Sequence, residues 1–338
     1  MNKTLKYKNT HANPNANKKT KIHKKTQKNS TFKKVNCSPE VDNQKISSDT
    51  CITSNVLRTI QQQYNTAYPT NKITQKEPIK AWNELKQRLR CEKDECFLKQ
   101  IKNTSVREEL KEKLFAPKHP EEWKSNPKEW LSNYDIMKVM RQYEKTYPEF
   151  KLIGPTTIDF DTRVPEYGFK CVLEDLCQFS LQKFIDAGKT KIGIVFNLDK
   201  YYQSGSHWVS MFIDIPNRFI FFFDSADHSI PHEIWTENPE DNSLVNRIIR
   251  QGKEMPSPIL FTFYNNRGIN HQRGNTECGM YSLFFIITML TGKTMHSDEN
   301  IKGGYNGYLC VKKRKNLFLK KRIPDEMVFQ YRKIYFNE

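Results

Sequence analysis

Three short apolar runs, each bounded by turn-forming residues, constrain the fold of this chain more than any other feature. Their lengths and their aromatic and β-branched content are typical of buried strands. The tripeptide Pro216-Asn217-Arg218 predicts a tight turn between the second and third runs, which makes them an antiparallel hairpin. A further strand is expected at 259–263. The three runs are residues 192–198, 208–213 and 219–223.

Helical periodicity on both sides of these runs predicts an α+β fold, with a central mixed sheet flanked by helices. Ser132 is a suitable N-cap for the first helix of this region, and the pair Gly154-Pro155 is expected to end that unit. The helices are expected at about 132–143, 173–187, 278–289 and 325–335.

The first part of the chain differs in composition and periodicity. Residues 1–50 are rich in Asn, Lys, Thr and Ser, and they contain too little apolar surface to offset chain entropy, so a disordered basic tail is expected. Residues 51–118 predict a small helical arm, and prolines then mark a junction before a domain at 125–338. The apolar positions at helical spacing in the arm are Leu57, Ile60, Tyr64, Tyr68, Trp82, Leu85, Leu89, Phe97, Ile101, Val106, Leu110 and Leu114.

The positive charge of the chain is concentrated near its N-terminus. The net charge is +17, and residues 1–35 contain eleven lysines, no arginine and no acidic residue. Removing these eleven charges leaves +6 for the rest of the chain. Such a segment can bind nucleic acid or an acidic membrane by counterion release. A solvated, solubilising arm explains the same composition equally well, and both interpretations are open.

The eight cysteines lie at irregular spacings that match neither a zinc site nor paired CxxC motifs. No metal or cofactor is therefore expected, and the thiols are expected to be free in a reducing compartment. The chain has no apolar run as long as a membrane span and no signal-peptide pattern at its start, which favours a soluble intracellular protein. The cysteines are Cys37, Cys51, Cys91, Cys96, Cys171, Cys177, Cys278 and Cys310.

Four polar residues can carry covalent catalysis: in chain order, His207, Asp224, Gln272 and Cys278. Cys278 lies where a polar loop meets an apolar helix, and the helix dipole there favours a thiolate. Gly279 after it would let a substrate backbone approach closely. The Gln272 side chain can donate to a developing oxyanion together with the backbone N–H of Cys278. By itself, a cysteine at such a junction is more often a buried structural thiol, so the assignment depends on its companions.

His207 precedes one strand of the expected hairpin and Asp224 follows the other, so the two residues lie at the same end of that hairpin. The carboxylate can then hold one imidazole nitrogen while the other nitrogen faces Cys278. Two neighbours, Asp227 and His228, lie so close along the chain that sequence geometry alone does not exclude them.

Three ordered motifs are shared with a known group of proteases. They are His207-Trp208 at the start of a strand, Asp224 at the end of the next strand, and Gln272 six residues before Cys278-Gly279. At these motifs the chain resembles the ubiquitin-like-protein proteases (deSUMOylases), with adenovirus protease and the polyprotein protease of African swine fever virus. The resemblance implies a papain-like, adenain-type fold and a cysteine endopeptidase that uses these four residues without a cofactor.

The pair Trp130-Leu131 resembles the motif that opens the catalytic domain in this family. By that resemblance, Trp130 and Trp208 flank a narrow tunnel for a Gly-Gly substrate terminus. Two flat indoles leave room for a backbone without β-carbons, so glycine is selected by exclusion. The alternative is that both tryptophans belong to the core.

Segments 154–160 and 322–325 resemble the large-DNA-virus branch of the family, which also carries a helical arm before its protease domain. The resemblance implies cleavage after Gly-Gly in viral capsid or core polyproteins, at assembly sites in the host cytoplasm and in the virion. An alternative is an isopeptidase that removes SUMO or ubiquitin from host conjugates. A third hypothesis, a non-catalytic protein that packs nucleic acid, is disfavoured by the intact set of four catalytic residues.

Overall fold

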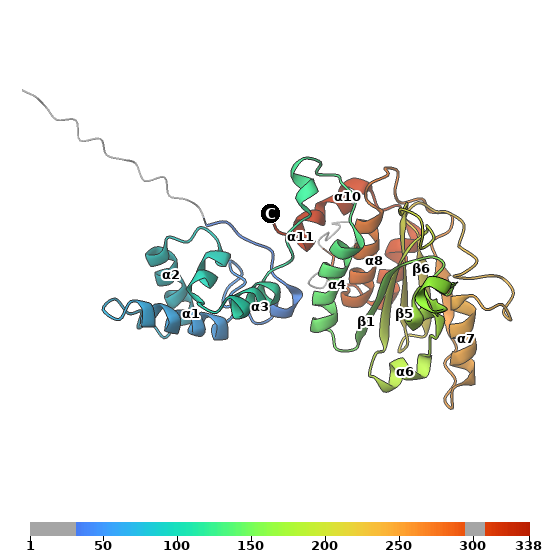
Figure 1. The fold of residues 1–338 in the computed structure, drawn as a ribbon, viewed down its shortest axis with the longest axis horizontal. Helices are drawn as coiled ribbons and strands as arrows, with labels where there is room; N and C mark the ends of the chain where they lie inside the picture. The colour runs from blue at the N-terminus through green and yellow to red at the C-terminus, as the bar shows by residue number, and fades with distance from the viewer. Residues whose placement is uncertain (1–31, 295–307) are drawn as a thin grey trace, which may run out of the picture.

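The computed structural model describes residues 32–294 and 308–338. Figure 1 shows a smaller helical lobe, the N-terminal arm, beside a larger lobe built on a sheet. The strands of that sheet are β1 (Phe150–Thr157), β4 (Lys191–Asn197), β5 (Trp208–Asp214), β6 (Phe219–Phe223) and β7 (Thr262–Asn265), and β2 (Arg163–Val164) pairs separately with β3 (Lys170–Cys171). Their order is β1-β4-β5-β6-β7, with parallel outer pairs and antiparallel inner pairs. The expected mixed sheet and its central hairpin are therefore confirmed.

Helices cover both faces of the sheet. Phe221 and Phe223 pack under one layer of helices, and Ile220 and Phe222 pack under the other, so that every residue of β6 is buried. The first layer contains α4 (Asn133–Thr146), α8 (Cys278–Thr291), α9 (Val311–Lys320), α10 (Asp325–Gln330) and α11 (Arg332–Tyr335). The second contains α5 (Glu174–Cys177), α6 (Leu181–Asp186) and α7 (Leu244–Glu254).

Local signals explain where two of the first-layer helices begin. The Ser132 hydroxyl accepts a hydrogen bond from the Asp135 N–H, and the Asp135 carboxylate accepts from the Ser132 N–H, so the predicted cap of α4 is confirmed as a capping box. Helix α8 begins at Cys278 as expected, and all of its 14 residues are buried. Within the described residues, no helix has the length and the apolar character needed to cross a membrane.

Several expected elements differ in the structure. The pair Gly154-Pro155 does not end a unit but lies inside β1, where the pairing register with β4 shifts. Proline is tolerated there because β1 is an edge strand. The single helix expected at 173–187 is two helices, because Ser180 caps a new one by accepting from the Lys183 N–H. The helix at 325–335 is likewise divided, and β7 starts three residues later than 259, at Thr262.

The arm has a core of its own. Its helices are α1 (Ser54–Ala67), α2 (Pro78–Leu89) and α3 (Thr104–Leu114), with a 3₁₀ helix at Asp94–Gln100 between the last two. Most of the apolar positions expected in this core are buried there, including Ile60, Leu85 and Phe97. Tyr68 and Val106, also at helical spacing, are 46% and 39% exposed and lie outside this core.

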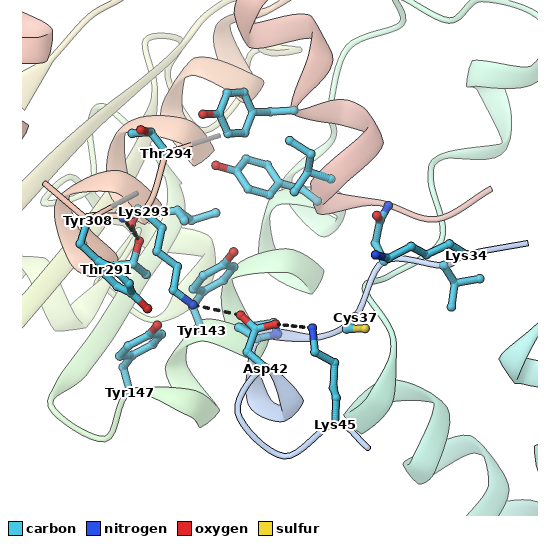
Figure 2. A pocket seen from close by; sticks show the side chains of 17 residues that line it. Lys34, Cys37, Asp42, Lys45, Tyr143, Tyr147, Thr291, Lys293, Thr294 and Tyr308 are labelled. Atoms are coloured by element: carbon cyan, nitrogen blue, oxygen red, sulfur yellow. Dashed lines mark hydrogen bonds and ion pairs between the residues drawn. The ribbon is translucent and has the colours of Figure 1, made fainter. Parts of the chain in front are cut away.

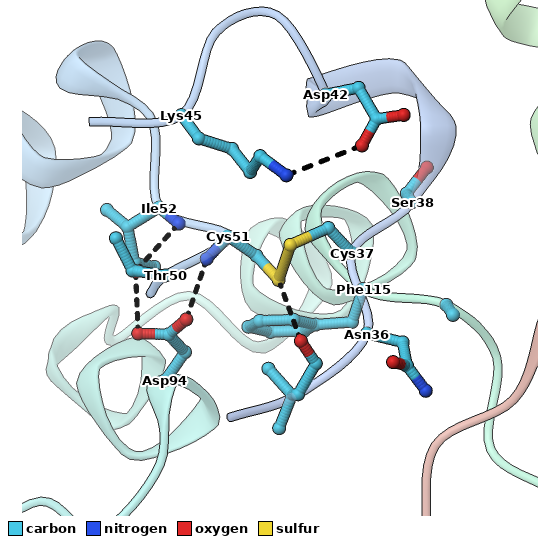
Figure 3. Close-up of a disulfide and its surroundings, with 12 residues drawn as sticks. Asn36, Cys37, Ser38, Asp42, Lys45, Thr50, Cys51, Ile52, Asp94 and Phe115 are labelled. Carbon is cyan, nitrogen blue, oxygen red and sulfur yellow. Dashed lines mark hydrogen bonds and ion pairs between the residues drawn. A yellow bond between two sulfur atoms is a disulfide. The ribbon is translucent and has the colours of Figure 1, made fainter. Parts of the chain in front are cut away.

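Residues 32–50 are packed against this arm, so the expected disordered tail is wrong for that part of 1–50. Val41 is fully buried, and a disulfide joins Cys37 to Cys51 (Figure 3). The buried Asp94 carboxylate accepts hydrogen bonds from the Thr50 hydroxyl at 2.8 Å and from the Cys51 N–H at 2.7 Å. Residues 1–31, with most of the Lys-rich segment 1–35, lie outside the described residues.

The expectation of free thiols is also wrong for most of the cysteines. The folded chain brings each pair of α-carbons to between 5.2 and 6.3 Å, which is within reach of a disulfide. Among the described residues, only Cys278 and Cys310 carry free thiols. The three disulfides are Cys37–Cys51, Cys91–Cys96 and Cys171–Cys177.

The C-terminal residues join the arm to the larger lobe. The Asn36 N–H donates to the Asn337 side-chain oxygen at 2.7 Å. The Asn337 side-chain amide donates in turn to the carbonyls of Asn36 and Ala116, both at 2.9 Å. Its backbone N–H donates to the Pro117 carbonyl at 2.8 Å. Residues from the two ends of the described chain therefore close the connection between the lobes together.

A cavity of about 500 Å³ lies along this junction (Figure 2). Its lining comes from both lobes, and the Lys293 ammonium reaches from the larger lobe to the Asp42 carboxylate of the arm at 3.0 Å. Lys45 pairs with the same carboxylate at 3.5 Å. Tyr143 of α4 and Tyr147, which directly follows α4, also line the cavity.

Helix α8 packs tightly against the sheet at Gly193 of β4. A β-carbon there would lie 2.9 Å from Ile286 Cγ2 and 3.0 Å from Phe150 Cζ. We therefore expect Gly193→Ala to lower the free energy of unfolding by about 1–3 kcal/mol through overpacking, measured by urea denaturation. Lys200→Ala, at an exposed position, should leave stability unchanged. Equal stability of both variants would contradict this close contact.

Candidate active site

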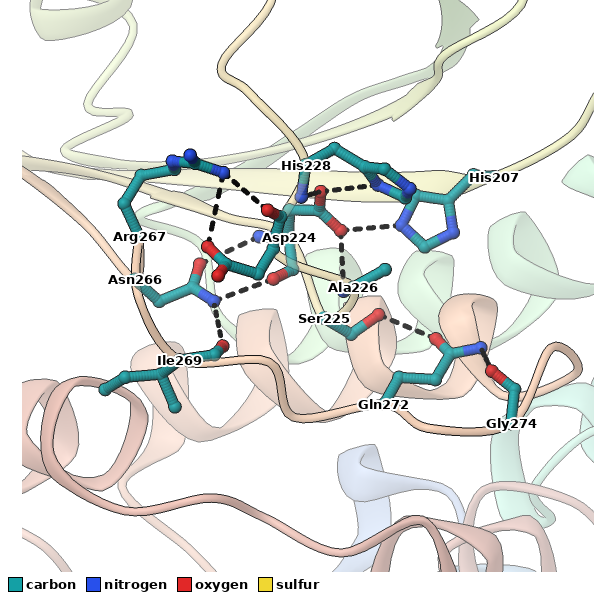
Figure 4. Close-up of polar contacts among 11 residues, drawn as sticks. His207, Asp224, Ser225, Ala226, His228, Asn266, Arg267, Ile269, Gln272 and Gly274 are labelled. Atoms are coloured by element: carbon teal, nitrogen blue, oxygen red, sulfur yellow. Dashed lines mark hydrogen bonds and ion pairs between the residues drawn. The ribbon is translucent and has the colours of Figure 1, made fainter.

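His207 and Asp224 meet at one end of the β5–β6 hairpin, because β5 begins directly after His207 and β6 ends directly before Asp224. The His207 Nε2 atom lies 2.6 Å from Asp224 Oδ1 (Figure 4). The Asp224 carboxylate is buried, and it also accepts hydrogen bonds from the N–H groups of Ala226 and His228, each at 2.8 Å. The expected pairing of these two side chains is therefore present in the structure.

Charge is favoured on both members of this pair. Burial lowers the pKa of His207, but its hydrogen bonds to Asp224 and Cys278 outweigh burial and raise that pKa to about 9. Burial raises the pKa of Asp224, yet the hydrogen bonds from His207 and from the two backbone N–H groups bring it below its ordinary value. An imidazolium held by a carboxylate is thus the resting state at neutral pH.

Cys278 supplies the third part of the arrangement. It is the first residue of α8, it is 2% exposed, and its thiol is free. Because Nε2 of His207 is bound to Asp224, its Nδ1 is the nitrogen left for the hydrogen bond with Cys278. The sulfur therefore lies beside the His207 imidazole at the first turn of α8.

Gln272 is held by a residue that the sequence did not single out. Its side-chain oxygen accepts from the Ser225 hydroxyl at 2.8 Å, and its own N–H donates to the Ser225 carbonyl at 2.7 Å. The side-chain NH₂ group donates to the Gly274 carbonyl at 2.9 Å, inside the loop that leads to Cys278 (Figure 4). Ser225 therefore fixes which end of the Gln272 amide faces the loop, as an oxyanion donor requires.

Asn266 is a second residue that sequence reasoning missed. Its side chain accepts a hydrogen bond from the Asp224 N–H at 3.0 Å and donates one to the Asp224 carbonyl at 2.7 Å. Both main-chain polar groups of Asp224 are therefore bound by one side chain. The available signal was its place after β7, because β7 runs parallel to β6 and the two strands end at the same edge.

The structure distinguishes Asp227 from His228, the two neighbours of Asp224 that the sequence alone did not exclude from the site. The Asp227 carboxylate faces away, toward Arg267 at 3.3 Å and the Gly268 N–H at 2.9 Å. His228, in contrast, places its Nδ1 2.9 Å from Asp224 Oδ2, so Asp224 is shared by two imidazoles.

Trp208 and Gly279 form one contact beside Cys278. The Trp208 indole N–H donates to the Leu131 carbonyl at 3.0 Å. A β-carbon on Gly279 would lie 3.1 Å from Leu131 Cβ and 3.3 Å from Trp208 Cδ1. Gly279 is buried against these side chains, so it makes room for them rather than for a substrate backbone. Trp130, next to Leu131, is 39% exposed and is not a core residue.

Two groups of described residues bring three metal-ligating atoms within 4.8 Å of one another. In the first, His207, Asp224 and His228 already hydrogen-bond to one another, and these bonds account for their arrangement. In the second, Cys171 and Cys177 share a disulfide, so their sulfurs are not thiolate ligands.

Replacing Asp224 should weaken the charged pair at Cys278. In Asp224→Asn the imidazolium loses its carboxylate, so the pKa of His207 should fall from about 9 toward its ordinary value of 6.5. The upper pH limit of the ion pair would fall with the pKa of His207. Alkylation of Cys278 by iodoacetamide at neutral pH should therefore slow by at least about tenfold, which is the change that one pKa unit corresponds to. Alkylation rates from pH 5 to 10 provide the measurement.

Asp227→Asn is the matched control, because that carboxylate faces Arg267. It should leave the alkylation profile unchanged. A wild-type profile in Asp224→Asn would show that this acid does not maintain the charged pair.

Comparison with known proteins agrees with this geometry. Residues 187–326 match the family model of the Ulp1 protease family, C-terminal catalytic domain. A mimivirus protein named as a thiol protease is 32% identical over 204 residues, which span 60% of this chain and 62% of that protein. A cysteine protease of African swine fever virus is 26% identical over 285 residues, 79% of this chain and 90% of that protein. A counterpart from another isolate, at 25% identity, is named a SUMO-1 cysteine protease.

The fold is also similar to a solved structure. The crystal structure of the African swine fever virus protease matches with a TM-score of 0.53 at 20% identity, and the match covers 90% of this chain and 97% of that one. The similarity includes the arm as well as the larger lobe. Residues 187–326 are thus similar to the catalytic domain of the Ulp1 protease family, and these matches, with the arrangement of His207, Asp224 and Cys278, support a cysteine protease.

Proposed function

We propose that this chain is an endopeptidase that cleaves after Gly-Gly in structural polyproteins of a large DNA virus during virion maturation. The viral relatives support the setting, and the surroundings of Cys278 support the choice of glycine. The chemistry requires only residues of this chain and a water molecule.

One observation carries the proposal of glycine selection: the indole of Trp208 and the side chain of Leu131 both lie against Gly279, the residue directly after the nucleophile. The Trp208 N–H bond to the Leu131 carbonyl fixes the two segments to each other, and the exposed Trp130 directly precedes Leu131 in the chain. Flat aromatic walls beside the nucleophile would leave little room for a β-carbon on the acyl side of the scissile bond.

The reaction follows from the charge state of the pair. The Cys278 thiolate attacks the glycine carbonyl carbon, and the oxygen that becomes negative is stabilised by the Gln272 amide and the backbone N–H of Cys278 at the start of α8. The His207 imidazolium gives its proton to the leaving amine. The neutral imidazole then takes a proton from water, whose oxygen attacks the thioester and releases the acid and the thiolate.

A second candidate is removal of a SUMO-like modifier from host proteins, favoured by the name SUMO-1 cysteine protease on a relative. Such modifiers also end in Gly-Gly, so the same walls would serve both substrates. Covalent capture by SUMO or ubiquitin vinyl-sulfone probes separates the candidates. Efficient capture that requires Cys278 would favour the modifier, and no capture with cleavage of Gly-Gly-X peptides would favour the polyprotein.

The proposed setting is viral assembly sites in the host cytoplasm and the virion. The Lys-rich segment 1–35 supports a nucleic-acid or other polyanionic partner there by its charge. Salt-dependent DNA binding that disappears when residues 1–31 are deleted would support this partner. Binding that survives the deletion would contradict it.

The endopeptidase proposal is tested with Gly-Gly-X and Gly-Ala-X peptides. Wild-type protein should cleave the first and not the second, Cys278→Ala should cleave neither, and Gln272→Ala should lose about two to three orders of magnitude in kcat. Turnover by Cys278→Ala equal to wild type would refute the nucleophile, and equal cleavage of both peptides would refute glycine selection.

The contribution of Trp130 has a matched control nearby. Trp130→Ala should admit Gly-Ala-X, because one wall of the site is removed. Tyr134→Ala removes an aromatic ring that is 66% exposed, and it should leave the discrimination intact. If both variants keep the wild-type preference for glycine, Trp130 is not a wall of the site.

A further inference from the structure

Arg332, in the short helix α11, is an almost fully buried cation with an unusually complete set of partners. It is 4% exposed, and its guanidinium donates to both oxygens of the buried Glu277 carboxylate at 3.0 and 3.1 Å. It also donates to the carbonyls of Thr276 at 3.3 Å, Pro127 at 3.1 Å and Glu129 at 2.8 Å. The guanidinium thus has acceptors on two separate segments of the chain.

The two segments bound by Arg332 are those that bear the nucleophile and a proposed wall of the site. Glu277 immediately precedes Cys278, and Glu129 immediately precedes Trp130. Each segment is held through groups within three residues of its functional side chain. A shift of this guanidinium would therefore change the spacing between Cys278 and Trp130.

The start of the nucleophile loop is held from the same part of the chain. The Asp325 carboxylate accepts from the N–H groups of Arg273 and Gly274, at 3.0 and 2.9 Å, and from the Tyr281 hydroxyl at 2.8 Å. Residues 273–277 are consequently fixed at one end by Asp325 and at the other by Arg332.

The chemistry of this contact favours a positional role over a stabilising one. Removing two charges from water costs free energy that their attraction often fails to recover, and apolar pairs of similar volume are frequently as stable. An apolar pair, however, cannot bind carbonyls on two segments at once. Arginine can, because its five N–H donors lie in a rigid planar fork, whereas lysine offers a single flexible ammonium.

We propose that Arg332 is a positioning residue that sets the distance between the Cys278 loop and the Trp130 segment, and thereby the preference for glycine. This deepens the proposed function and rests on it for the substrate. The role of Arg332 toward Cys278 itself does not depend on the identity of the substrate.

Three variants test the proposal. Arg332→Lys keeps the charge and removes the fork. The double variant R332M/E277L removes both charges and restores a buried apolar pair, which should recover stability. Arg247→Lys is the matched control: Arg247 also donates to two backbone carbonyls, those of Cys177 and Leu176, but it lies in α7 on the opposite face of the sheet. Circular dichroism and thermal unfolding establish that each variant is folded.

Two readouts report position rather than stability. The first is the kcat/KM ratio for Gly-Gly-X over Gly-Ala-X peptides, and the second is the pH profile of Cys278 alkylation by iodoacetamide, which needs no substrate. Folded Arg332→Lys and the double variant should lose roughly 100-fold in kcat, as a displacement of about 1 Å in a reacting group can cause. Both should discriminate less against alanine and show an altered alkylation profile, while Arg247→Lys behaves as wild type.

The outcome that overturns the proposal is a folded Arg332→Lys, or a double variant, with either the wild-type glycine preference or the wild-type alkylation profile. If wild-type protein does not cleave Gly-Gly-X at all, the proposed function fails. The alkylation profile alone then decides the role of Arg332: an altered profile in folded Arg332→Lys supports it, and a wild-type profile overturns it.

Discussion

The complete burial of α8 is the constraint on which the larger lobe depends. A helix that is apolar on every side must be enclosed, and here the sheet lies on one side while α4 and the C-terminal helices lie on the others. The enclosure fixes where the helix begins, and therefore where Cys278 lies. Two glycines make the enclosure possible because they have no β-carbon. Gly193 lets the helix pack closely against the sheet, and Gly279 lets Leu131 and Trp208 pack against the first turn of the helix.

Around this fixed sulfur, the Asp224 carboxylate organises the charges. It hydrogen-bonds to the imidazoles of His207 and His228 and accepts from two backbone N–H groups. Asn266 hydrogen-bonds to the main chain of the same residue. Burial alone would favour the neutral forms of both His207 and Asp224. The number of donors on one carboxylate reverses that preference, which gives Cys278 a cationic neighbour at neutral pH.

The features that the sequence predicted are those with a local signal. The β5–β6 hairpin follows from apolar runs around a turn tripeptide, and α4 follows from the capping serine Ser132, so their positions were correct. The pairing of His207 with Asp224 could be predicted because the hairpin brings them together. Strand β1 was missed because its Gly154-Pro155 pair is typical of a break, and only its place at the sheet edge makes the pair tolerable. The contacts of Ser225 and Arg332 join segments at least 40 residues apart, so no spacing along the chain could reveal them.

The bond between Asn36 and Asn337 also orders events during synthesis. The two residues are 301 positions apart, so at ribosomal rates of 5–20 residues per second the second follows the first by roughly 15 to 60 s. During that interval the arm has emerged without the residues that fasten it, and in its last part Glu277 has emerged without Arg332, which follows 55 residues later. A nascent chain therefore contains His207, Asp224 and Cys278 before it contains the segment that holds their loop. Translation and the completion of the active site are thus separated in time by the topology of the chain itself.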